Sequence, residues 1–171
     1  MDFTRLTTEL DPVGLVKVLN EIFSYFDTLV EKYDVEKIRT IGDNYMVAAG
    51  VPDPVDDHAH LLAKMALDMQ SYLDNRRDEE GFPIRYRIGI NSEPVIGGVI
   101  GHKKFVHDVW GDAVNIASRM QSSSKPGRIQ VSEATFELLK NDFNLQPRGP
   151  VNLKGRGEFH TWYLAGKKPA E

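Results

Sequence analysis

The 171-residue chain contains no cysteine, and this absence excludes disulfide bonds, thiolate metal ligands and cysteine nucleophiles. It also lacks any run of about 18 apolar residues that could span a membrane. Its N-terminus shows no basic segment followed by an apolar one, which is the pattern of an export signal. We therefore predict a cytoplasmic domain from these residues.

Positive charge is not in excess either. The 21 basic residues are outnumbered by 25 acidic ones, which gives a net charge of −4 and argues against nucleic acid as a partner. The chain has no Gly-x-x-x-x-Gly-Lys-Ser/Thr loop and no Gly-x-Ser-x-Gly elbow, which disfavours P-loop nucleotidases and serine hydrolases. Its 41% hydrophobic and 27% charged residues are typical of a folded protein, and its length suits a single domain over residues 1–171.

Hydrophobic periodicity divides the chain into helices and strands. Apolar residues three and four apart indicate helices, alternating ones indicate strands, and glycine or proline clusters mark the turns. The predicted elements are helix 11–33, a hairpin over 35–51 that turns at 42–44, helix 59–73, strands 84–90, 95–100 and 105–110, helix 111–120, strand 129–131, helix 132–140, and strands 143–146 and 159–164. This order predicts an α+β domain whose antiparallel sheet is covered by helices on one face.

The predicted hairpin carries the first candidate site. Asp43 lies at its tip, where a carboxylate could reach a hard cation such as Mg²⁺. Arg39 lies four residues earlier on the same face and could serve a phosphate, a base or a carboxylate. The alternatives are an aspartate chosen for its turn conformation and an ordinary exposed strand arginine.

A second candidate site spans the predicted strand-to-helix corner near residue 111. Asn115 and Arg119 are four residues apart and share a helix face, and Asp108 precedes them on the incoming strand. A carboxylate, an amide and a guanidinium could together bind an amine, a sugar and a phosphoryl group. The spacing alone fits equally well with a capping aspartate and a surface arginine.

Residues 151–157 form a third candidate, because Lys154 and Arg156 alternate with glycines in a predicted flexible loop. Such a loop could bring positive charge against a triphosphate, although short basic turns also serve solubility. By contrast, His58 and His60 are two residues apart and point away from each other on a helix, so a paired metal site is not expected there.

Three motifs together resemble the class III nucleotidyl cyclases: Lys37 to Met46, Arg87 to Ser92 and Asp108 to Met120. The resemblance extends to residues 154–157 and 161–164 and is strongest to bacterial, particularly mycobacterial, membrane adenylyl cyclases. It implies a ferredoxin-like α+β domain that pairs head to tail as a homodimer with its active sites at the interface. It also implies a cytoplasmic domain, either free or on the cytosolic face of the membrane within a larger protein.

The resemblance implies a reaction and a metal cofactor. In the family, Asp43 corresponds to one of two aspartates that bind a pair of Mg²⁺ or Mn²⁺ ions, which act on the ribose 3′-hydroxyl and the triphosphate. The substrate would be ATP, and the products would be 3′,5′-cyclic AMP and pyrophosphate. Arg39 stands where adenylyl cyclases usually have lysine and guanylyl cyclases glutamate, so its positive charge favours adenine.

The resemblance also implies roles for residues of the partner subunit. Asp108 would recognise the adenine amino group, Asn115 would orient the ribose, and Arg119 would stabilise charge on the α-phosphate. Lys154, together with Arg156, would contact the β- and γ-phosphates.

The start of the chain departs from the family pattern. Only about ten residues precede the first long helix, which is short for a core strand and its connection. The family's first strand usually reads Asp-Ile-Val-Gly-Phe-Thr and supplies the other metal aspartate, whereas this chain begins Met1-Asp2-Phe3-Thr4. We therefore expect a domain truncated at its first strand, without the second metal aspartate. The alternative functions are an inactive cyclase-homology module that binds nucleotide or dimerises, and a guanylyl cyclase.

Overall fold

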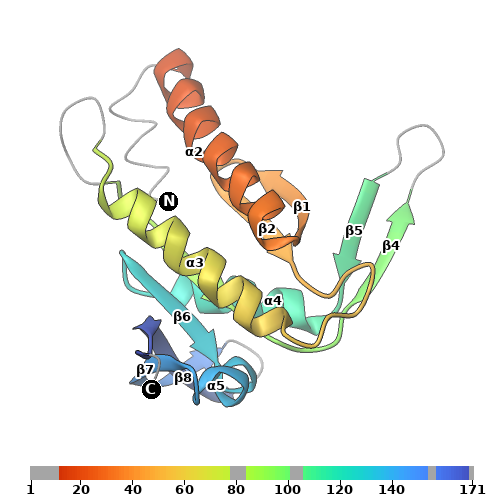
Figure 1. The fold of residues 1–171 in the computed structure, drawn as a ribbon, viewed down its shortest axis with the longest axis vertical. Coiled ribbons are helices and arrows are strands. Elements are labelled where there is room, and N and C mark those ends of the chain that lie inside the picture. The colour runs from red at the N-terminus through yellow and green to blue at the C-terminus, as the bar shows by residue number, and fades with distance from the viewer. Residues whose placement is uncertain (1–11, 78–83, 101–105, 154–156, 170–171) are drawn as a thin grey trace.

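A computed structural model describes residues 12–77, 84–100, 106–153 and 157–169 of the chain. Figure 1 shows the arrangement of the elements. In chain order these are α2 (Pro12–Tyr33), β1 (Glu36–Ile41), β2 (Asn44–Ala48), α3 (His58–Asp74), β3 (Arg87–Ile90), β4 (Ile96–Ile100), β5 (Val106–Trp110), α4 (Asp112–Ser123), β6 (Arg128–Ser132), α5 (Glu133–Leu139), β7 (Phe143–Leu153) and β8 (Gly157–Lys167). The predicted α+β class is confirmed.

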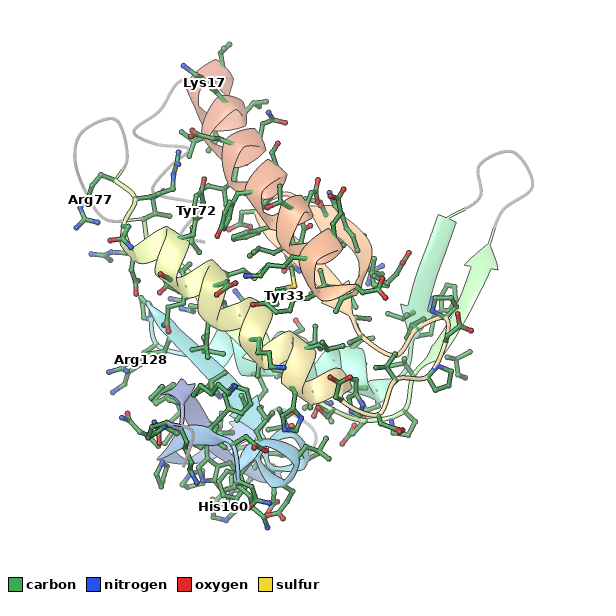
Figure 2. All side chains as sticks on the ribbon, in the orientation of Figure 1. Lys17, Tyr33, Tyr72, Arg77, Arg128 and His160 are labelled. Carbon is green, nitrogen blue, oxygen red and sulfur yellow. The ribbon has the colours of Figure 1, made fainter. Side chains whose placement is uncertain are left out.

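The two long helices pack against each other through their apolar stripes. Ile22, Phe26 and Leu29 of α2 are buried at three- and four-residue intervals, as the periodicity predicts. Between the helices the rings of Tyr25 and Tyr72 are stacked, with their centroids 3.7 Å apart; Figure 2 labels Tyr72 on α3. No helix within the described ranges is long and apolar enough to cross a membrane.

The strands form three separate hydrogen-bonded sheets within the described residues. Four strands pair in the order β3-β6-β8-β7, while β1 pairs with β2 and β4 pairs with β5. The β3–β6 pair is parallel, because the chain between them crosses back through α4, and the other pairs are antiparallel. The predicted antiparallel sheet is thus found with one parallel pair, β3–β6, within it.

Several strands differ from their predicted lengths, β7 most of all. β7 runs to Leu153, well beyond the predicted end at Gln146, and passes through Pro147 and Pro150. β7 lies at the edge of its sheet, so a proline without an N–H breaks no hydrogen bond on the open side of the strand. The pairing of β7 with β8 shifts register between Pro147 and Gly149. β3 begins only at Arg87, although the predicted strand starts at Ile84.

Three hydrophobic clusters divide the core. The largest two lie on either side of α3: one against α2 around Ile22 and Met65, the other against the four-stranded sheet around Ile129 and Phe143. The β4–β5 ribbon extends away from both (Figure 1). α3 therefore lies between α2 with its hairpin and the four-stranded sheet.

Candidate functional site

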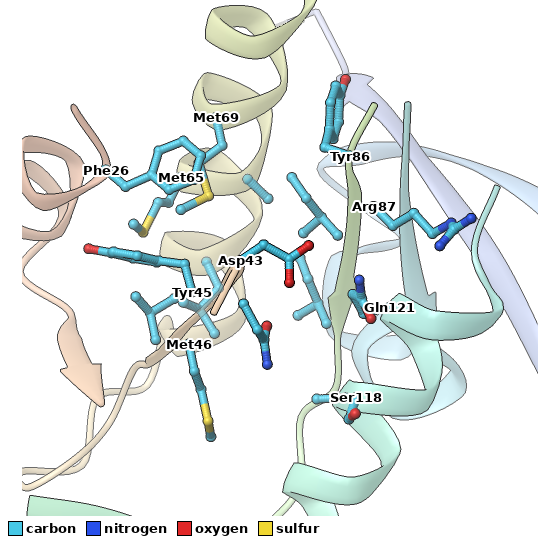
Figure 3. Close-up of a pocket in the computed structure, with 18 of the residues that line it drawn as sticks. Phe26, Asp43, Tyr45, Met46, Met65, Met69, Tyr86, Arg87, Ser118 and Gln121 are labelled. Carbon is cyan, nitrogen blue, oxygen red and sulfur yellow. The ribbon is translucent and has the colours of Figure 1, made fainter. Parts of the chain in front are cut away.

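A cavity of about 340 Å³ lies between the β1–β2 hairpin, helices α2 and α3, and the unit formed by β3 and α4 (Figure 3). Phe26, Met65 and Met69 make its helix side apolar. Asp43 and Asn115 contribute polar groups from the hairpin and from α4. The size and the mixture of apolar and polar walls suit a small-molecule ligand.

Three of the predicted site residues share this cavity. Arg39 and Asp43 of the hairpin and Asn115 of α4 all line it, and Asp43 is half-buried whereas the other two are exposed. Arg119 lies one helical turn beyond Asn115, is exposed, and is not among the lining residues. The resemblance implies that Asn115 and Arg119 act from the partner subunit. Within one chain, Asn115 nevertheless shares a cavity with Arg39 and Asp43, and Arg119 does not line it.

The remaining predicted residues lie wholly or partly beyond the described structure. The backbone of Asp108 belongs to β5 and pairs with Gly98 of β4, but its side chain is outside the described residues. Lys154 and Arg156 lie outside the described residues as well.

The structure adds polar residues that the sequence reasoning missed. Ser118 and Gln121 of α4 line the cavity, as does Asn91 at the end of β3. Ser118 and Gln121 follow Asn115 at three-residue steps, so they lie near it on one helix face. The three-residue spacing from Asn115 was therefore the sequence signal that could have identified Ser118 and Gln121. The four-residue spacing from Asn115 selects Arg119 instead.

Two buried contacts fix where α4 begins. The Asn91 side-chain amide donates to the carbonyl oxygen of Ala113 at 3.2 Å, and its oxygen accepts from the Ser132 hydroxyl at 2.6 Å. Ser132 also caps α5, because its hydroxyl accepts from the Thr135 backbone N–H. Ala113, in the first turn of α4 and two residues before Asn115, is thus tied to the ends of β3 and β6.

The hairpin is held to α2 by a polar cluster of Asp27, Lys37 and Tyr45. Burial alone would raise the pKa of the Asp27 carboxyl, but hydrogen bonds from Lys37 and Tyr45 and the positive charge of Lys37 outweigh burial, so the pKa is lowered. Burial first, and then the bond to Asp27, raises the pKa of Tyr45. Tyr45 therefore stays a neutral hydrogen-bond donor.

The side-chain oxygens that line the cavity are potential ligands of a metal ion. Asp43 is the one carboxylate among the described lining residues, and Asn44, Asn91 and Asn115 add amide oxygens. Hard divalent cations prefer such oxygen ligands, so Asp43 fits a single Mg²⁺ or Mn²⁺ ion. A pair of ions needs a further carboxylate from outside the described residues or from another chain.

In the described ranges, the cavity included, no cluster of three or more histidine, cysteine, aspartate or glutamate side chains is placed to hold a metal. His58 contacts the Val55 carbonyl oxygen at 3.0 Å, and His60 contacts Asp142 at 3.1 Å. The two histidines therefore have separate partners.

Residues 1–166 match the family described as the adenylate and guanylate cyclase catalytic domain. The chain belongs to this family. The sequence of this cyclase domain is 46% identical over 168 residues to an adenylate cyclase of Mycobacterium tuberculosis, a match that covers 98% of the chain and 38% of that protein. The chain thus spans little more than a third of this relative.

Solved structures share the fold of this cyclase domain. A guanylate cyclase domain from Catenaria anguillulae in complex with GTP superposes with a TM-score of 0.91 at 34% identity and covers 98% of this chain and 92% of that one. A dimeric guanylyl cyclase domain from Blastocladiella emersonii gives a TM-score of 0.89 at 33% identity, with the same coverage of 98% and 92%. The resemblance found in the sequence motifs is therefore confirmed at the level of family and fold.

Proposed function

We propose that this cyclase domain converts ATP to 3′,5′-cyclic AMP and pyrophosphate. The observation that carries the proposal is the meeting of Arg39, Asp43 and Asn115 at one cavity of small-molecule size. The identity of 46% to an adenylate cyclase over 98% of the chain supports ATP as the substrate. Arg39 supports it too, because a cation there offers no acceptor to the amino group of guanine.

Asp43 would hold the divalent cation. When bound, Mg²⁺ or Mn²⁺ supplies charge neutralisation for the triphosphate and activation of the ribose 3′-hydroxyl. The half-buried position of Asp43 suits this role, because a carboxylate partly removed from water interacts more strongly with a cation. The family's pair of ions requires a second carboxylate in addition to Asp43.

The protein groups would act by binding and orientation. The Asn115 amide would hold the ribose so that its 3′-oxygen faces the α-phosphate, and Arg119 would stabilise the charge that develops there. We assign Asp108 to the adenine amino group. Lys154 and Arg156 would bind the β- and γ-phosphates that leave as pyrophosphate.

A homodimer would complete the site. Arg119 is exposed on the same helix as Asn115 but outside its own cavity, so it is available to the cavity of a second copy. The β4–β5 ribbon supports such pairing, because Ile96 at 73% and Trp110 at 37% expose apolar surface that a partner subunit would cover. We therefore propose that active sites form between two chains and that ATP and a second copy are the partners.

The experiment is a measurement of cyclic AMP from ATP, and of cyclic GMP from GTP, with Mn²⁺ at several protein concentrations. Light scattering on the same samples gives the mass in solution. We expect cyclic AMP to dominate, specific activity to rise as dimers form, and Asp43→Asn to abolish it. Cyclic GMP as the main product would overturn the base assignment, and activity that Asp43→Asn leaves intact would overturn the metal role.

Two alternatives each have an observation in their favour. The similarity to a domain in complex with GTP favours a guanylyl cyclase. The single carboxylate among the described cavity residues favours an inactive module that binds nucleotide or dimerises without turnover. A chain that binds Mn²⁺ and ATP but forms neither cyclic nucleotide at any concentration would establish the second alternative.

A further inference from the structure

The β1–β2 hairpin is not hydrogen-bonded to either of the other two sheets in the described structure. Its position therefore depends on packing against α2 and, at β1, against β5. The hairpin tip carries Asp43, which follows Gly42 at a φ of 58° in the tight turn closed by the Ile41–Asn44 pair. Whatever fixes the hairpin on α2 also fixes where Asp43 stands in the cavity.

Asp27 of α2 joins the helix to both strands of the hairpin. Its two carboxylate oxygens accept from the Lys37 ammonium of β1 at 2.6 and 2.9 Å, and one of them also accepts from the Tyr45 hydroxyl of β2 at 2.5 Å. One carboxylate thereby orients two strands at once. The bond to Tyr45 begins two residues from Asp43, closer to the tip than the bond to Lys37.

The Tyr45 ring is packed on several sides. Its centroid lies 5.3 Å from those of Phe23 and Phe26, and the Lys37 ammonium lies 5.0 Å from it. In Figure 3 the ring and the Asp43 carboxylate point to different sides of the hairpin end, the ring toward Phe26 and the carboxylate into the cavity. Apolar packing against α2 holds the ring, and the directional hydroxyl bond to Asp27 adds a fixed polar contact between the hairpin and α2.

We propose that Tyr45 is a positioning residue for the nucleotide site. Its hydroxyl, bonded to Asp27, sets the angle of the hairpin on α2 and so places the Asp43 carboxylate and the Arg39 guanidinium in the cavity. The proposal deepens the proposed function and rests on it for the role of Asp43. Tyr45 itself does not contact the substrate in this scheme.

The chain contains its own control for this cluster. Asp68 of α3 accepts from the Lys32 ammonium at 2.7 Å and from the Tyr33 hydroxyl at 2.8 Å, so the same three residue types join α2 to α3. Tyr33 lies at the end of α2 beside α3 (Figure 2) and does not line the cavity. Tyr33→Phe thus removes an equivalent hydroxyl bond without touching the hairpin.

The test compares Tyr45→Phe with Tyr33→Phe in two measurements. Electron paramagnetic resonance of Mn²⁺ with ATP present gives the metal affinity, and amide hydrogen exchange reports the opening of residues 39–46. For Tyr45→Phe we expect the Mn²⁺ affinity to fall by about tenfold and amide exchange at residues 39–46 to become faster. A tenfold loss is the lower end of the range for residues that orient a metal ligand without binding the metal themselves. For Tyr33→Phe we expect neither change.

Asp27→Ala tests the same hydrogen bond from its other end and removes the bonds from Lys37 as well. It should weaken Mn²⁺ affinity at least as much as Tyr45→Phe does, and adding Tyr45→Phe to Asp27→Ala should weaken it no further, because the Tyr45 hydroxyl has already lost its partner. Equal exchange at residues 39–46 in Tyr45→Phe and Tyr33→Phe would overturn the proposal. Additive losses in the double variant would also overturn it.

The failure of the proposed function has a different signature. If Asp43→Asn binds Mn²⁺ as well as the unaltered chain does, the metal role of Asp43 is wrong. Hydrogen exchange still tests the positioning role of Tyr45 in that case. Faster exchange at residues 39–46 in Tyr45→Phe but not in Tyr33→Phe supports the role, and unchanged exchange in Tyr45→Phe rejects it.

Discussion

A β-carbon placed on Gly89 of β3 would stand 2.5 Å from the carbonyl oxygen of Ala117 in α4, and closer still to the backbone nitrogen of Gln121. The backbone of the helix therefore rests directly on the strand. Any side chain at Gly89 must push α4 away, and Asn115 and Arg119 move with it. The glycine is required by this close approach rather than by an unusual backbone angle.

We predict that Gly89→Ala lowers the free energy of unfolding by about 1 to 3 kcal/mol, the usual cost of overpacking. Cyclic nucleotide formation should fall further than stability explains, because Asn115 is displaced. Gly97→Ala is the matched control: its nearest contact would be a terminal methyl of Val51 at 3.0 Å, which can rotate aside. Urea denaturation and product assays measure both effects, and equal losses in the two variants would contradict the prediction.

The exposed polar residues of α4 should behave in the opposite way. Asn115→Ala and Arg119→Ala remove side chains that face solvent, so stability should change by about 0.5 kcal/mol or less. Cyclic AMP formation should fall by about 100-fold or more if these groups stabilise the transition state. Ser122→Ala, exposed on the same helix, should leave turnover unchanged. A loss of turnover that merely tracks thermal stability would refute their catalytic roles.

Much of the fold could be predicted from local patterns because its helices are strongly amphipathic. The stripe predicted from Asp11 to Tyr33 matches α2 at Pro12–Tyr33, and the hairpin turn at 42–44 is found where expected. The long β7 strand could not be predicted in this way. Its prolines usually break strands, and only its place at a sheet edge makes them tolerable.

The sequence motifs select residue types for the candidate site but do not define its geometry. The sequence motifs selected Arg39, Asp43 and Asn115, and these share a cavity. The motifs also selected Arg119, whose exclusion from the cavity depends on the direction in which α4 crosses β3. No local pattern encodes that direction, because it is set by the tertiary contact at Gly89.

Acid should weaken the link between α2 and the hairpin. Because the folded-state pKa of Asp27 is lowered, its stabilising contribution is present above its unfolded pKa and is lost as pH falls through the folded value. We expect the loss to begin below about pH 4 and to amount to about 1 kcal/mol or less, since the pair is partly exposed. Urea denaturation from pH 7 to pH 3 should show that the free energy of unfolding depends less on pH in Asp27→Asn than in the unaltered chain. If the two proteins lose stability in parallel as the pH falls, Asp27 is not the source of the loss.

Asn91 should matter to stability more than an ordinary surface amide does. It donates to the Ala113 carbonyl oxygen and accepts from Ser132, whose side chain is buried, so Asn91→Ala leaves two polar groups short of a partner. We predict a loss of about 1 to 3 kcal/mol in unfolding free energy. Asn144→Ala, which removes one long 3.4 Å bond at an exposed position, should cost far less. Asn91→Asp keeps the acceptor for Ser132 but loses the donor to Ala113. If Asn91→Asp is destabilised as much as Asn91→Ala, the bond to α4 supplies the stability. If Asn91→Asp is as stable as the unaltered chain, the bond to Ser132 of β6 supplies it.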